Sequence, residues 1–234
     1  MSAILEVQDI HTFIGQFHIL EGVTVEVPDN SITALLGRNG AGKTTTLRSI
    51  MGLNPPARGA IRYRGRAISG RKPYDIAQLG IGYVPDYRAI FRQLTVEENL
   101  KIAERRPGDL AGKRPFIFEI FPDLERLYQW PGGQLSGGQQ QMLAIARALV
   151  ADNNLLLIDE PSEGLAPVII EAMMAAIRRL TAHVAVLLVE QNFRVASQLA
   201  DRYVIIEDGK SVHSGLMTDL LASPALIQKY LSAA

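Results

Sequence analysis

The stretch Gly37-Arg38-Asn39-Gly40-Ala41-Gly42-Lys43-Thr44 decides the fold of this chain. It satisfies the pattern G-x-x-x-x-G-K-[ST] in full, and it lies between an apolar segment, Ser31–Leu36, and a helical segment, Lys43–Met51. In that strand–loop–helix context the glycines let backbone N–H groups turn inward around phosphate oxygens, and the helix N-terminus adds positive potential. The sequence therefore predicts a phosphate-binding loop in an α/β protein.

The side chains of this phosphate loop have separate predicted roles. Lys43 is expected to neutralise the β- and γ-phosphates of a nucleotide, and the Thr44 hydroxyl is expected to ligate Mg²⁺. A Gly-rich turn without a ligand is the alternative, which the flanking strand and helix disfavour. The predicted nucleotide contacts are Gly37, Arg38, Asn39, Gly40, Ala41, Gly42, Lys43, Thr44 and Thr45.

A second segment, Leu155–Pro161, places two acids at the end of an apolar run. The run predicts a buried strand whose C-terminal end carries Asp159 and Glu160, and ligands bind at that edge of open α/β sheets. Asp159 is expected to hold Mg²⁺, and Glu160 is expected to polarise the attacking water. Glu160 and Lys43 are therefore candidate catalytic residues. A strand that merely ends in an acidic turn is the alternative.

A third segment, Leu135-Ser136-Gly137-Gly138-Gln139, opens a predicted helix, Gly137–Val150. Ser136 and Gln139 have the spacing of a capping box, so the simplest interpretation is a well-capped helix. A cap does not need two consecutive glycines, which cost about 1 kcal/mol each in a helix interior. Their presence favours a phosphate approaching bare backbone, so nucleotide contacts are predicted for Ser136, Gly137, Gly138 and Gln139.

The phosphate loop, the Ser136–Gln139 segment and the strand ending in Asp159-Glu160, in that order, resemble the ATP-binding-cassette (ABC) ATPases over nearly the whole chain. The resemblance implies the α/β fold of a P-loop NTPase cassette: a mixed sheet core, an antiparallel β subdomain and a helical subdomain near residues 87–150, within a single domain of residues 1–234. It also implies ATP and Mg²⁺ as ligands. Two cassettes would hold each ATP between the phosphate loop of one and the Ser136–Gln139 segment of the other.

Val189-Glu190-Gln191-Asn192 and the segment Glu160–Pro167 are similar to one subgroup: the smaller ATPase subunits of branched-chain amino-acid importers and their urea and amide relatives. That resemblance implies a second cassette, often a sister subunit, two membrane-spanning permease subunits and a periplasmic binding protein. It places the chain in the cytoplasm, at the inner face of the cell membrane. Gln191 stands where most ABC ATPases have a switch histidine, and its amide can still donate to a γ-phosphate oxygen. It is the third candidate catalytic residue, the alternative being a polar residue that ends a strand.

Two positions depart from the pattern of the wider family. The aromatic residue that stacks on adenine should fall near Ile14, so Phe13 or Phe17 is expected to take its place, with Phe13 the predicted contact. Asp86 stands where a glutamine is expected, after Tyr83-Val84-Pro85. Its carboxylate is a candidate to reach Mg²⁺ through a bound water, because this cation keeps several waters. A surface-loop aspartate without function is the alternative.

Composition limits the remaining possibilities. Lys plus Arg and Asp plus Glu number 24 each, and this balance argues against a nucleic-acid partner. The chain has no cysteine, which excludes disulfides, thiolate metal sites and cysteine nucleophiles. No secretory signal is visible, and the apolar run Val184–Val189 is too short to span a membrane. A non-transport ABC ATPase, a P-loop phosphotransferase and a non-hydrolysing regulator stay open as alternatives.

Further elements follow from turn residues and periodicity. The predicted strands outside the motifs are Ile4–Val7, Ile19–Val27, Ala60–Tyr63, Arg66–Ile68, Tyr203–Ile206 and Ser211–His213, and the stretch Pro107–Arg114 is predicted to be a loop. The resemblance also implies a groove that receives a helix of a membrane subunit. Residues before Leu135 are candidates for either the core or that docking surface: Phe116, Phe118, Phe121, Tyr128 and Trp130.

Overall fold

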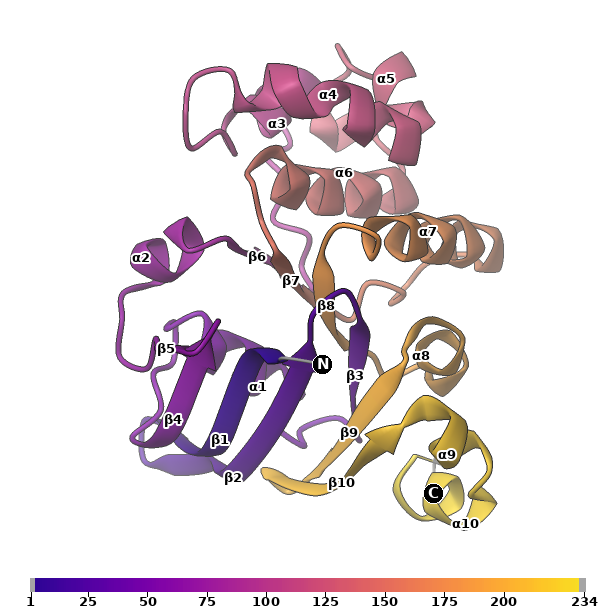
Figure 1. The fold of residues 1–234 in the computed structure, drawn as a ribbon. Helices are drawn as coiled ribbons and strands as arrows, with labels where there is room; N and C mark the ends of the chain where they lie inside the picture. The colour runs from indigo at the N-terminus through magenta and orange to yellow at the C-terminus, as the bar shows by residue number, and fades with distance from the viewer. Residues whose placement is uncertain (1–2, 232–234) are drawn as a thin grey trace.

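A six-stranded sheet forms the centre of the computed structural model, which describes residues 3–231 (Figure 1). The order of its strands is β10-β9-β3-β8-β7-β6, with only β10 antiparallel to its neighbour. Every residue of β3, β7 and β8 is buried, as expected for parallel strands covered on both faces. The bounds are β3 (Ile32–Leu36), β6 (Ile81–Val84), β7 (Leu155–Asp159), β8 (Ala185–Val189), β9 (Arg202–Glu207) and β10 (Lys210–Leu216).

A second, antiparallel sheet has the order β2-β1-β4-β5 and lies beside the central sheet (Figure 1). Its bounds are β1 (Ala3–Ile14), β2 (Phe17–Pro28), β4 (Arg58–Tyr63) and β5 (Arg66–Ala67). The predicted strand Ile4–Val7 was too short, because β1 continues to a tight turn at which Ile14 pairs with Phe17. The predicted strand Arg66–Ile68 ends one residue early, although the Ile68 N–H still donates to Ile61.

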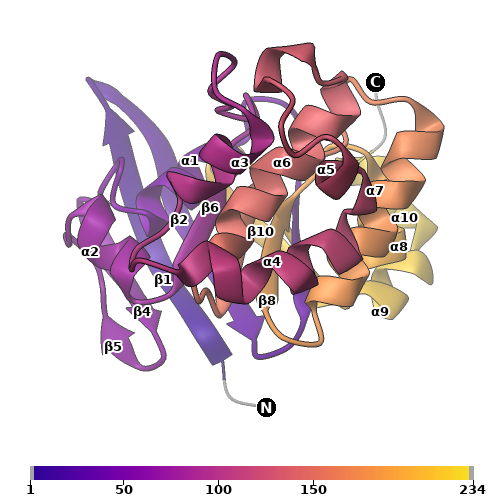
Figure 2. The ribbon, with the colours of Figure 1, turned by 90° about the horizontal axis from the view of Figure 1, so that it is seen from above.

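Helices cover both faces of the central sheet (Figures 1 and 2). Between residues 87 and 150 all described elements are helical, and α3, α4 and α5 pack against α6. The limits of a helical subdomain there, and the single domain of residues 1–234, stay predictions. The bounds are α1 (Lys43–Ile50), α2 (Pro73–Gln78), α3 (Val96–Lys101), α4 (Asp109–Ile120), α5 (Pro122–Arg126), a 3₁₀ turn η1 (Gly132–Gln134), α6 (Gly137–Val150), α7 (Pro167–Leu180), α8 (Phe193–Leu199), α9 (Met217–Leu221) and α10 (Pro224–Tyr230).

The prediction of a loop over Pro107–Arg114 was wrong, because α4 begins at Asp109. The Asp109 carboxylate accepts hydrogen bonds from the backbone N–H groups of Arg105 (3.0 Å) and Arg106 (2.9 Å), and this contact fixes the turn that starts the helix. Pro115 lies inside α4 and removes one backbone donor. The carbonyl that loses its partner belongs to Ala111, which is exposed, so water can replace the missing bond.

The two faces of the sheet belong to two apolar cores. Leu156 and Ile158 of β7 pack in the core that contains α6 and α7, whereas Leu155 and Leu157 pack in the core that contains α1 and β1. This division follows from the alternation of side chains along a strand. Because apolar residues hold each central strand on both faces, the loops at its C-terminal end leave the sheet from fixed positions. Within residues 3–231, no helix has both the length and the apolar character needed to span a membrane.

Candidate functional site

The predicted functional segments leave the sheet from three neighbouring strands (Figure 1). The phosphate loop follows β3, Glu190 and Gln191 follow β8, and Glu160 follows β7. The register pairs Asp159 with Val189 and Leu35 with Val189, so the three strands end at the same level. Segments far apart in the sequence thus meet at the C-terminal edge of a parallel sheet, where such sheets bind ligands.

The phosphate loop needs glycine at both of its ends. Gly37 has φ 148° and Gly42 has φ 110°, values that residues with a Cβ rarely adopt. A Cβ on Gly37 would lie 2.2 Å from the carbonyl oxygen of Ile206, and one on Gly42 would lie 2.7 Å from Leu20. The turn between β9 and β10 supports the loop, since the Gly209 N–H donates to the carbonyl of Ala41 (3.0 Å). Bare backbone is therefore required here.

Lys43 is held at the start of α1 with its ammonium group inside the loop. The residue is only 4% exposed, and its Nζ donates to the carbonyls of Gly37 (3.0 Å) and Arg38 (3.1 Å). The same Nζ lies 3.5 Å from Glu160 Oε1. The structure thus brings together the predicted cation of the phosphate loop and the predicted catalytic carboxylate.

Asp159 ends β7 as a buried carboxylate with two hydroxyl partners. Thr44 Oγ1 donates to one carboxylate oxygen (3.1 Å), and the Tyr83 hydroxyl donates to the other (3.4 Å). Burial raises the pKa of Asp159 to about 6; the negative charges of Asp86 and Glu160 act in the same direction, and the two hydrogen bonds oppose it. Hydroxyl and carboxylate oxygens are the ligands that Mg²⁺ prefers, so the donor set fits this cation.

Glu160 has a strained backbone. Its φ of 43° lies in the left-handed region, which costs a non-glycine residue roughly 1–3 kcal/mol. A hydrogen bond from its N–H to the carbonyl of Val189 (2.9 Å) joins the end of β7 to that of β8. The exposed Gln191 lies two residues beyond Val189. Because β8 lies between β3 and β7, the turn that carries Gln191 lies between the phosphate loop and the turn that carries Glu160.

The Ser136–Gln139 segment forms the capping box that its spacing predicts. The Gln139 N–H donates to Ser136 Oγ (3.3 Å), and the Ser136 N–H donates to Gln139 Oε1 (2.9 Å). The two glycines differ, however. A Cβ on the buried Gly138 would lie 2.4 Å from Ile169, so packing of α6 against α7 explains that glycine, whereas Gly137 is exposed.

The Ser136–Gln139 segment does not meet the phosphate loop within this chain. Among the hydrogen bonds and ion pairs of residues 3–231, none joins it to residues 37–44. Figure 1 shows the two segments on different parts of the molecule: the segment begins α6 in the helical region, and the loop precedes α1 beside the sheets.

Phe13 and Asp86 are both exposed. Phe13, 48% exposed, stacks on His18 with 4.2 Å between the ring centroids, so one face of its ring is covered. Phe17 is more exposed, at 65%. Asp86 accepts a hydrogen bond from the Tyr87 N–H (2.9 Å), and its charge acts on Asp159. Adenine stacking by Phe13 and a Mg²⁺ contact by Asp86 stay predictions.

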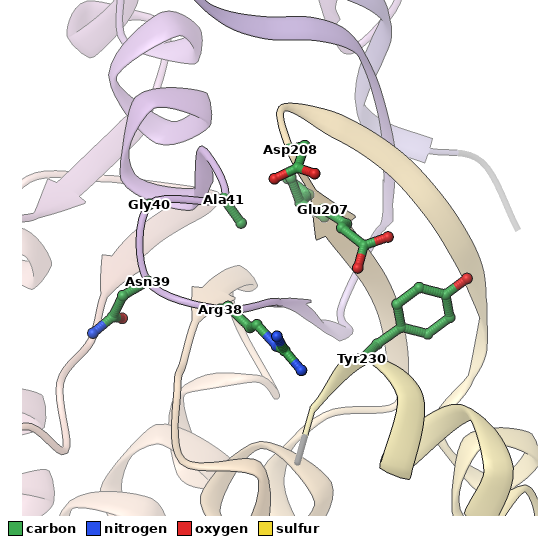
Figure 3. Close-up of a pocket in the computed structure, with 8 residues that line it drawn as sticks. Arg38, Asn39, Gly40, Ala41, Glu207, Asp208 and Tyr230 are labelled. Carbon is green, nitrogen blue, oxygen red and sulfur yellow. The ribbon is translucent and has the colours of Figure 1, made fainter. Parts of the chain in front are cut away.

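A cavity of about 270 Å³ flanks the phosphate loop (Figure 3). It is lined by Arg38–Ala41, by Ile206 and Glu207 at the end of β9, by Asp208 of the β9–β10 turn, and by Tyr230 of α10. The figure shows both carboxylates beside the loop. Neither Lys43 nor Asp159 lines this cavity, and its two acidic side chains would repel a phosphate. It is therefore a flank of the site rather than the seat of the phosphates.

Two residues of this region escaped the sequence analysis. Tyr83 lies on β6, in register with Leu157 of β7, and only that pairing brings its hydroxyl to Asp159. Glu190 was interpreted only as part of the segment Val189–Asn192, in which Gln191 was the predicted functional residue. The signal that could have identified Glu190 is that this acid directly follows a buried strand. That strand lies beside the strand that ends in Asp159. In the structure, Glu190 is 1% exposed.

Glu190 makes the stability of the protein depend on pH. Burial raises the pKa of this carboxyl from 4.5 to about 7, against the hydrogen bonds it accepts. A raised pKa stabilises the folded state fully below the pKa of the unfolded chain, and the contribution is lost as the pH rises through the pKa of the folded protein. Between about pH 4.5 and 7, the loss is on the order of 3 kcal/mol.

We expect Glu190→Gln to remove this loss. The free energy of unfolding of the variant, minus that of the wild type, should rise by on the order of 3 kcal/mol between pH 4.5 and 7.5. The raised pKa of Asp159 also makes stability depend on pH, but this contribution is the same in both proteins and cancels in the difference. Urea unfolding at the two pH values measures the difference, with Glu171→Gln, an exposed position on α7, as the matched control. Equal pH dependence in wild type and Glu190→Gln would show that folding does not raise the pKa of Glu190.

Comparison with known proteins defines the class of this site. Residues 20–163 match the family described as ABC transporter. The high-affinity branched-chain amino acid transport ATP-binding protein BraG of Pseudomonas aeruginosa is 40% identical over 230 residues, covering 97% of this chain and 99% of that protein. The probable branched-chain amino acid transport ATP-binding protein LivF of Archaeoglobus fulgidus is 37% identical over 210 residues, covering 88% and 89%.

Solved structures agree with the sequence relatives. A nucleotide-free ATP-binding cassette from an ABC transporter superposes with a TM-score of 0.87 at 25% identity and covers 97% of this chain and 98% of that one. The ATP-binding subunit of another ABC transporter gives 0.82 at 29% identity, covering 99% and 95%. The chain therefore belongs to the ABC transporter family and has the ATP-binding cassette fold that the resemblance implied. It is a nucleotide-binding, ATP-hydrolysing subunit of an ABC importer.

Proposed function

We propose that this chain hydrolyses Mg²⁺-bound ATP at an interface between two cassettes, and thereby powers the import of branched-chain amino acids or a related small polar solute. The observation that carries the proposal is a site divided in two. Lys43, Thr44, Asp159 and Glu160 converge at one edge of the sheet, whereas within residues 3–231 no hydrogen bond or ion pair joins them to the exposed start of α6. A second cassette supplies the missing half.

Each residue of the site has one task in this mechanism. The loop Gly37–Thr45 wraps the phosphates with backbone N–H groups, and Lys43 exchanges its carbonyl partners for phosphate oxygens. Glu160 accepts a proton from the attacking water, and the Gln191 amide donates to the γ-phosphate. The Ser136–Gln139 segment of the partner cassette closes the site through the Ser136 hydroxyl and the exposed start of α6. Phe13 offers its free face to the adenine.

Mg²⁺ would be held by Thr44 and Asp159, which already contact one another. When bound, this cation neutralises phosphate charge in phosphoryl transfer. Asp86 is the further candidate, because its charge reaches Asp159. Asp86 is exposed, so a water between its carboxylate and the cation suits its position.

Asp86→Ala should therefore raise the Mg²⁺ concentration that gives half-maximal ATPase activity. A lost outer-shell carboxylate should weaken the apparent affinity by about 10-fold. Nucleotide binding without Mg²⁺ should change little. Asp29→Ala, in the exposed turn after β2, is the matched control. If Asp86→Ala and wild type give the same Mg²⁺ titration, Asp86 has no part in holding the cation.

A groove beside the site suits a helix of a membrane-spanning permease subunit. It has a volume of about 290 Å³. Residues of α2, β6 and α6 line it, together with residues that follow α1 and α3. Its lining includes Tyr83, whose hydroxyl donates a hydrogen bond to Asp159. An occupant of the groove would therefore contact a residue that is hydrogen-bonded to the predicted Mg²⁺ ligand. None of the candidate aromatic residues between Phe116 and Trp130 lines it; Phe121 is buried, and Trp130 is 51% exposed.

The solute and the other partners follow from the relatives. BraG and LivF are named for branched-chain amino-acid transport, and their similarity spans most of this chain. We extend to this chain the assembly of a second cassette, two permease subunits and a periplasmic binding protein, with a position at the inner face of the cell membrane. The balanced charge and the family match both argue against a nucleic-acid partner.

Isolation of the tagged chain in mild detergent tests this assembly. We expect membrane-spanning subunits and a second cassette to accompany it. Arg105→Glu, which reverses a charge in the groove, should reduce their recovery, whereas Arg66→Glu, on β5 and outside the groove, should not. ATP binding by each isolated variant checks that the site is intact. A chain recovered without any membrane protein would contradict the proposal.

A further inference from the structure

Glu190 is a buried carboxylate that the mechanism above does not use. It follows β8 and is 1% exposed, yet none of the ion pairs among residues 3–231 includes it. Burying an acid without a cationic partner costs free energy, so the hydrogen bonds of Glu190 must offset this cost. Those bonds are directed to the two loops that carry the predicted catalytic residues.

Each oxygen of the Glu190 carboxylate has a defined partner. Oε1 accepts from the backbone N–H of Ser162 (3.1 Å). Oε2 accepts from Ser162 Oγ (2.9 Å) and from the backbone N–H of Asn192 (3.3 Å). Ser162 lies two residues after Glu160, and Asn192 directly follows Gln191. One side chain therefore joins the turn that follows β7 to the turn that follows β8.

The turn after β7 needs such a contact because of its conformation. Glu160 has a positive φ of 43°, which the chain adopts only where the surroundings enforce it. On its N-terminal side the enforcing contact is the hydrogen bond from the Glu160 N–H to the carbonyl of Val189 (2.9 Å). Beyond Glu160, the two bonds from Ser162 to Glu190 hold the turn. The strained residue is thus held between two contacts, both made by the end of β8.

We propose that Glu190 is a positioning residue for ATP hydrolysis: its carboxylate fixes the turns of Glu160 and Gln191 relative to one another, so that both side chains face the same γ-phosphate. This inference rests on the proposed roles of Glu160 and Gln191. Among the hydrogen bonds and ion pairs of residues 3–231, none joins Glu190 to residues 37–44, so Glu190 acts through the two turns.

Steady-state ATP hydrolysis by Glu190→Ala tests the inference. A displacement of about 1 Å in a catalytic group can cost about 100-fold in rate, so kcat should fall by about that factor. The KM for ATP and the affinity for Mg²⁺-free ATP should stay within about 2-fold, because Lys43 and the glycines of the phosphate loop have no bond to Glu190. Glu190→Gln keeps the shape and one acceptor oxygen, and should recover a large part of kcat.

Ser162→Ala provides a second route that leaves the carboxylate in place. It removes one of the three bonds, and should lower kcat less than Glu190→Ala does. Adding Glu190→Ala to Ser162→Ala should cost less than Glu190→Ala costs in the wild type, because the two residues act through one contact. Glu171→Gln, exposed on α7, should leave kcat unchanged.

The results that would overturn the positioning role of Glu190 differ from those that would overturn the proposed function. A wild-type kcat in Glu190→Ala, or additive effects of Glu190→Ala and Ser162→Ala, would overturn the positioning role. A loss of ATP affinity as large as the loss of kcat would overturn it in favour of a structural role. In both cases Lys43→Ala and Glu160→Gln would still be inactive, and the proposed function would stand. If those two variants also hydrolyse ATP at the wild-type rate, the proposed function itself fails.

Discussion

Lys43→Ala is expected to abolish ATP hydrolysis and to weaken ATP binding strongly. In the structure the Lys43 ammonium is buried, supported by the carbonyls of Gly37 and Arg38, and 3.5 Å from Glu160. Removing it leaves the phosphates without their buried cation and leaves Glu160 without its counter-charge. Loss of one electrostatic contact to a transition state typically costs 10²–10³ in rate, and the fall here should be at least about 1,000-fold.

Phosphate release and equilibrium binding of ATP measure the two effects of Lys43→Ala separately. Lys101→Ala is the matched control, because this lysine is exposed at the end of α3. It should leave both quantities unchanged. Unchanged turnover in Lys43→Ala would mean that the loop does not bind the phosphates of the hydrolysed nucleotide.

Glu160→Gln should separate binding from hydrolysis. The amide keeps the size and shape of the side chain but cannot accept the proton of the attacking water, so kcat should fall by about 10²–10⁴-fold. ATP binding should persist, because Lys43 and the phosphate loop are unaltered. The backbone conformation at φ 43° should also persist, since the Glu160 N–H and its bond to Val189 are unchanged.

Single-turnover hydrolysis and retention of radiolabelled ATP measure the outcome for Glu160→Gln. Glu125→Gln, exposed on α5, is the control and should hydrolyse ATP at the wild-type rate. A Glu160→Gln protein that also turns over at the wild-type rate would show that another group orients the water.

The phosphate loop could be predicted because its chemistry is local. Eight successive residues contain the glycines, the lysine and the hydroxyl, and the flanking apolar strand and helix are visible in the same stretch. The end of β7 was equally accessible, since a short apolar run followed by two acids needs no tertiary information. The meeting of Thr44 with Asp159, and of Lys43 with Glu160, then followed from the order of the strands.

What the sequence did not reveal depends on contacts between distant segments. Tyr83 reaches Asp159 only because β6 pairs with β7, and Glu190 reaches Ser162 only because β7 pairs with β8. Gly138 shows the converse. Its sequence context favoured a ligand contact, yet its missing side chain is explained by Ile169 of α7. Helix α4 was missed because the stretch Pro107–Arg114 was interpreted as a loop, whereas the Asp109 side chain starts the helix.

Hydrolysis of ATP between two cassettes requires that two cassette chains be present together when ATP is bound. The Glu160→Gln chain, isolated from cells through a tag in the presence of ATP and Mg²⁺, is analysed by native mass spectrometry. We expect an assembly with two cassette chains, either two copies or one copy and a sister subunit, with ATP bound between them. A tagged chain that retains ATP as a single cassette, without a second one, would contradict it.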